Sequence, residues 1–136
     1  MSIVYVAMSN AMQEWGADVG VSKQLYKVGY AEGDPLDAIK LLNDENYAGH
    51  SDWQLAGSRE VEGLDTETVF ERACERQKVL DPLYYPRIKG AKDIVRLDQR
   101  KVEAHIVIKK TMEGRDSKVP KLKPADMADF LIEGIL

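Results

Sequence analysis

Cysteine and histidine are scarce in this chain. The single cysteine, Cys74, cannot form a disulfide within the chain, which is typical of a reducing compartment, and we expect a cytoplasmic protein. The two histidines, His50 and His105, lie far apart in the sequence, so a metal site built from cysteine and histidine is excluded. A bound metal ion would have to be a hard cation with oxygen ligands.

Long apolar runs are absent as well. No stretch approaches the roughly 20 apolar residues that span a bilayer. The apolar segment at the start has no basic residues before it, so we expect neither a membrane protein nor a signal peptide. Apolar residues make up 44% and charged residues 31% of the 136 residues, which is typical of one globular domain with its own core.

Charge is unevenly distributed along the chain. Residues 1–84 carry 7 Lys and Arg and 15 Asp and Glu, a net charge of −8, whereas residues 85–123 carry 12 and 5, a net charge of +7. A basic segment can contact nucleic-acid phosphates, because Lys and Arg release counterions there. It can equally form a solvated face or neutralise the acidic part of the same surface.

Three segments of the first half have the composition of strands: residues 2–8, 23–30 and 53–63, the last with Gly57 at a bulge. Alternation divides the second segment into two sets, Leu25, Lys27 and Gly29 on one face and Tyr26, Val28 and Tyr30 on the other. Two further strands are expected in residues 93–97 and 102–113, as a hairpin around residues 98–100.

Helices are indicated by caps followed by apolar periodicity. Asp34 and Pro35 begin a helix that ends near Asn43, and Asp65 caps an acidic helix. Pro124 begins a short terminal helix. Two consecutive strands argue against a purely parallel sheet, so the order of elements predicts an α+β protein with a small, mainly antiparallel sheet.

Four short motifs in this order resemble the GIY-YIG nuclease superfamily, and most closely its phage-type branch with a lysine in the second motif. The motifs are Val4-Tyr5-Val6, Tyr26-Lys27-Val28-Gly29-Tyr30, Asp34-Pro35 and Phe70-Glu71. The resemblance covers roughly residues 3–90. It implies a three-stranded antiparallel sheet flanked by helices in a core of residues 1–90. The resemblance does not account for residues 91–136, which we expect to form an extension of a β-hairpin, a basic linker and a short helix, packed on that core as one domain.

The resemblance also implies a function, hydrolysis of a DNA phosphodiester with one Mg²⁺ or Mn²⁺ ion. Carried over, Glu71 would bind the metal, Lys27 would help to activate water, and Tyr5 would hydrogen-bond that water or a phosphate oxygen. Gly29 and Tyr30 complete the second motif, and Gly29 would let a substrate approach the sheet. We expect the basic segment to contribute DNA contacts: Arg87, Lys89, Lys92 and Arg96.

One position departs from this pattern. The branch places a phosphate-binding arginine on the first helix, where this sequence has Ala38. Arg72 or Arg76 of the acidic helix is the nearest substitute that the sequence offers. An alternative prediction is therefore a catalytically inactive module of the same fold that binds nucleic acid or a protein partner.

Without the resemblance, each residue has a simpler interpretation. Tyr5 is a core aromatic residue of a strand, Lys27 a solvated strand residue, and Glu71 a surface partner for neighbouring cations on its helix.

Overall fold

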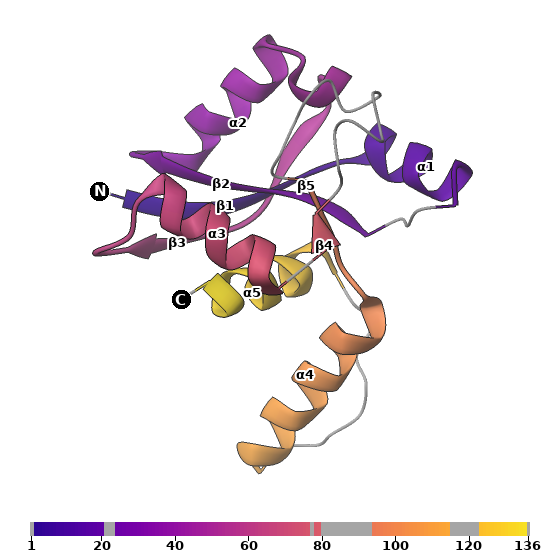
Figure 1. The fold of residues 1–136 in the computed structure, drawn as a ribbon, viewed down its shortest axis with the longest axis vertical. Coiled ribbons are helices and arrows are strands. Elements are labelled where there is room, and N and C mark those ends of the chain that lie inside the picture. The colour runs from indigo at the N-terminus through magenta and orange to yellow at the C-terminus, as the bar shows by residue number, and fades with distance from the viewer. Residues whose placement is uncertain (1, 21–23, 77, 80–93, 115–122, 136) are drawn as a thin grey trace.

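The computed structural model describes residues 2–20, 24–76, 78–79, 94–114 and 123–135 (Figure 1). Five antiparallel strands form one sheet in the order β3-β1-β2-β5-β4. Their bounds are β1 Ser2–Ser9, β2 Leu25–Glu32, β3 Trp53–Val61, β4 Lys78–Val79 and β5 Ile94–Arg96. The fold is thus α+β with a helix-flanked antiparallel sheet, as predicted, but β5 and β4 extend the expected three strands on the β2 side.

Helices lie on both faces of this sheet (Figure 1). Their bounds are α1 Asn10–Asp18, α2 Pro35–Asp44, α3 Thr66–Arg76, α4 Gln99–Met112 and α5 Pro124–Ile135, with a 3₁₀ turn η1 at Tyr47–Gly49. Two predicted caps are confirmed. The Asp34 carboxylate accepts the Leu36 amide at 2.9 Å, and that of Asp65 accepts the Thr68 amide at 2.7 Å. Each cap satisfies a backbone donor that the first helical turn leaves without a partner.

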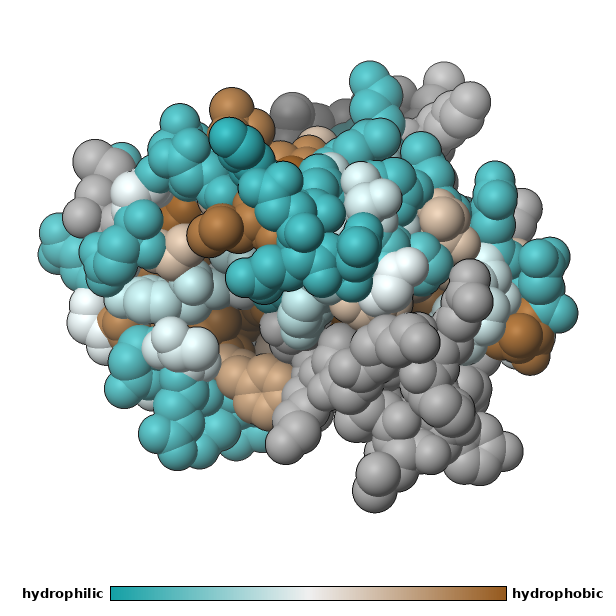
Figure 2. Space-filling view, turned by 90° about the horizontal axis from the view of Figure 1, so that it is seen from above, coloured by the Kyte–Doolittle hydropathy of each residue, from teal (hydrophilic) through white to brown (hydrophobic). Residues whose placement is uncertain are grey.

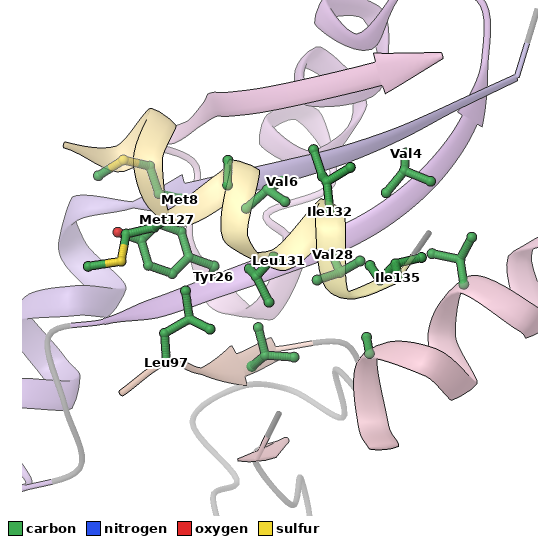
Figure 3. Close-up of a cluster of buried hydrophobic side chains, with 14 of the residues drawn as sticks. Val4, Val6, Met8, Tyr26, Val28, Leu97, Met127, Leu131, Ile132 and Ile135 are labelled. Carbon is green, nitrogen blue, oxygen red and sulfur yellow. The ribbon is translucent and has the colours of Figure 1, made fainter. Parts of the chain in front are cut away.

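The two faces of the sheet bury separate apolar clusters, because successive strand side chains point to opposite sides. We call them the α5 face and the α2 face. The α5 face joins strand residues to α3 and α5, as Figure 3 shows for Val4, Val6, Tyr26, Val28, Leu131, Ile132 and Ile135. On the α2 face, the alternate strand residues pack against α1 and α2. The strands contribute Ile3, Tyr5, Ala7 and Leu25, and the helices contribute Met12, Ile39 and Leu42. Each fully buried Val, Leu, Ile or Met side chain contributes about 1.5–3 kcal/mol to the free energy of unfolding.

Gly57 determines how closely α5 approaches the sheet. The register of β1 with β3 shifts between Val6, which pairs with Gly57, and Ala7, which pairs with Leu55, so the predicted bulge is present. A Cβ atom at Gly57 would lie 2.7 Å from Cβ of Ala128 in α5. Glycine therefore lets α5 pack directly against β3 at this point.

The prediction of a C-terminal hairpin is wrong, because residues 102–112 belong to helix α4. Asp98 does not turn the chain between strands; its carboxylate accepts the Arg100 amide at 3.0 Å and caps the helix. Val102 and Ile106, one helical turn apart, pack into the α5-face cluster. β-Branched residues lower helix propensity only slightly, so the cap and this packing outweigh them.

Candidate functional site

Tyr5 and Gly29 pack against each other on the α2 face. They are directly opposite in the register of β1 with β2. A Cβ atom at position 29 would lie 2.5 Å from Tyr5 Cε1 and closer still to Cζ and Oη. The space above Gly29 is therefore filled by the Tyr5 ring, which is only 5% exposed. Packing alone therefore explains why a tyrosine and a glycine occur at these two motif positions.

Lys27 is buried beside the same ring. Its residue exposure is 5%, and its Nζ atom lies 5.2 Å from the centroid of Tyr5 and 5.0 Å from that of Tyr47. The ammonium also donates a long hydrogen bond, 3.4 Å, to the Val28 carbonyl. A cation over an aromatic face is attracted to its negative quadrupole, more strongly where water is excluded. The structure thus brings Tyr5 and Lys27 together, with Lys27 buried where a solvated side chain was the simpler expectation.

Tyr47 is the residue of this group that the sequence did not single out, because it lies in a polar loop without a motif. Trp53 holds it in place: the indole Nε1 donates to the Tyr47 carbonyl at 3.0 Å, and the two rings are 6.0 Å apart. Asn43 in turn accepts the Trp53 amide at 2.7 Å. The end of α2 and the start of β3 together place the second ring against Lys27.

Glu71 lies on the other side of the sheet. Its helix α3 buries Val69 and Ala73 in the cluster on the α5 face, whereas Tyr5 and Lys27 face α2. At about 100° per residue, Glu71 is on the side of α3 opposite to Val69 and Ala73, and it is exposed. The structure therefore does not bring Glu71 to Tyr5 and Lys27.

The remaining motif residues are also separated. Tyr30 is half-buried against the α5-face cluster, and its hydroxyl donates to the exposed Glu32 carboxylate at 3.4 Å. Ala38 packs on the α2 face and offers no donor. Arg72 of the acidic helix donates to the Ile135 carbonyl at 2.8 Å and so satisfies an acceptor at the C-terminal end of α5. The Arg76 side chain lies outside the described part.

Of the four predicted nucleic-acid contacts, Arg87, Lys89 and Lys92 lie outside the described residues. Arg96 ends β5 and is exposed. In the register, Lys27 pairs with Ile94 and Leu25 with Arg96, so Arg96 is a diagonal neighbour of Lys27 on the α2 face. Such neighbours have Cα atoms about 7–8 Å apart. The exposed Arg96 therefore lies beside the buried Lys27.

A second polar group links α4 to α5. Glu133 of α5 accepts Lys109 Nζ at 2.8 Å and lies 2.7 Å from Nε2 of His105, whose ring meets Phe130 edge-on. The hydrogen bond from Lys109 holds the pKa of Glu133 below its ordinary value, and the same bond raises the pKa of Lys109. His105, which was expected in a strand, thus lies in α4 and contacts α5, an arrangement that the hairpin prediction did not include.

Asp52 fastens the start of α1 to the start of β3. Its carboxylate accepts the Ser9 hydroxyl and, at 2.9 Å, the Ala11 amide, while the Ser9 hydroxyl accepts the Met12 amide at 3.1 Å. Burial acts to raise the pKa of Asp52, but the hydrogen bonds from Ser9 and Ala11 outweigh it and lower this pKa. The carboxylate is therefore engaged in capping.

The residues present do not fit a metal site shared with Tyr5 and Lys27. Glu71 is on the far side of the sheet, and the described residues contain no group of three or more His, Cys, Asp or Glu placed to hold a metal ion. Comparison of the chain with family models, curated proteins and solved structures finds no match. No helix of the described part has the length and apolar character to cross a bilayer.

Proposed function

We propose that this protein is a nucleic-acid-binding module of GIY-YIG-like fold that does not cleave the phosphodiester bond. Its contact surface is the corner where β5 leads into α4, with Arg96 and Arg100 as the phosphate ligands. The proposal rests on one observation above all: both arginines are exposed, and neither is paired with a carboxylate of the described residues.

Arg96 and Arg100 lie on the two sides of this corner, close together in the sequence. Arg96 is the last residue of β5, and Arg100 is in the first turn of α4, which starts at Gln99. The connection between them is fixed, because the Leu97 amide donates to the Gln24 carbonyl at 2.9 Å and Asp98 caps α4. Guanidinium groups bind phosphate oxygens in bidentate geometry, which favours arginine at such a corner.

The charge of the whole chain supports the same surface. Residues 1–84 have a net charge of −8, so most of the molecule repels a polyanion, and the basic segment of residues 85–123 gives the attractive part of the field. Seen from the α2 side, the surface is mainly hydrophilic, with apolar atoms in small areas (Figure 2). The phosphate contacts are assigned to the corner because its exposed arginines, Arg96 and Arg100, supply the donors.

The positions of the motif residues support the proposed absence of cleavage. A general base and a metal ligand act on one phosphate only if both reach it, within hydrogen-bond distance or through one water. Lys27 is buried on the α2 face and Glu71 is exposed beyond the α5 face, with the sheet between them. Ala38 removes the phosphate donor that the resemblance implies on the first helix, and loss of such a donor commonly lowers a rate about 10²–10³-fold.

The test is binding of a fluorescent DNA duplex, measured by anisotropy over a range of salt concentrations. We expect wild-type affinity to fall with salt. In the Arg96→Glu/Arg100→Glu variant, affinity should fall and the slope of log K against log salt should shrink by about 2, at about 0.9 per phosphate contact. Lys40→Glu is the control, because Lys40 is an exposed cation of α2. Equal losses in both variants, or affinity that is indifferent to salt, would refute the assignment.

A further inference from the structure

We draw no further inference here: the strongest candidate, the exposed row of Ala104, Ile108 and Met112 along helix α4, carries none, because nothing in the part of the chain that the structure describes shows what covers it.

Discussion

Replacement of Gly29 by alanine tests the packing of the second motif. The new Cβ would lie 2.5 Å from Tyr5 Cε1, whereas carbon atoms in contact are about 3.5–4.0 Å apart. The Tyr5 ring would have to move by more than about 1 Å. It is 5% exposed and packed in the α2-face cluster, so there is little room for this movement.

The magnitude follows from two opposing effects. Overpacking of a buried site costs about 1–3 kcal/mol, while replacing glycine in a strand lowers the entropy of the unfolded chain and stabilises by about 0.4–1 kcal/mol. We expect Gly29→Ala to lower the free energy of unfolding by about 1–2 kcal/mol. Tyr5→Leu removes the ring atoms that the new Cβ would meet. In that background Gly29→Ala should be neutral or stabilising.

The assay is urea unfolding of wild type, both single variants and the double variant, which together give the coupling free energy. A change of sign of the Gly29→Ala effect between the two backgrounds is the expected result. If Gly29→Ala costs the same in both, the ring does not fill the space above Gly29, and the packing explanation of this motif fails.

Two further predictions concern stability. Gly57→Ala brings a Cβ to 2.7 Å from that of Ala128 and should lower the free energy of unfolding by about 1–3 kcal/mol, with a smaller loss if Ala128→Gly is added; additive losses would contradict this contact. Asp52→Asn should cost about 1 kcal/mol, because it weakens the cap of α1. Since the folded pKa of Asp52 is below its unfolded value, the carboxylate stabilises above the unfolded pKa, and this stability is lost as pH falls through the folded pKa. Acid unfolding of Asp52→Asn should thus depend less on pH than that of wild type; equal curves would refute the role of Asp52.

Strands β1, β2 and β3 and helices α2 and α3 could be predicted because their local signals agree with their tertiary environment, whereas α1, which has no clean apolar period, was not predicted as a helix. Alternation assigned Lys27 and Gly29 to one face of β2, and the clusters on the two faces confirm the division. The caps at Asp34 and Asp65 marked two helix starts correctly.

Helix α4 could not be predicted, because it is apolar on two sides. Val102 and Ile106 face the core while Ile108 and Met112 face outward, so neither helical nor strand periodicity stands out. Asp98 was the available signal, since it is a good N-cap before a long segment without glycine or proline.

The candidate site shows the same limit. The resemblance implied that Tyr5, Lys27 and Glu71 belong together, but their order along the chain does not determine which face of the sheet each helix covers. α3 packs on the α5 face through Val69 and Ala73, and this placement depends on the α5-face cluster as a whole. The position of Tyr47 depends likewise on Trp53, which is six residues away in sequence and belongs to none of the motifs.

We propose that the chain binds nucleic acid but leaves the phosphodiester intact, because the sheet separates Lys27 from Glu71. Incubation of supercoiled plasmid with Mg²⁺ or Mn²⁺, followed by electrophoresis, tests it most directly. We predict that plasmid is retarded by the protein yet remains supercoiled after the protein is removed. Nicking by the wild type that disappears in both Lys27→Ala and Glu71→Ala would contradict the claim and place the two residues at one site.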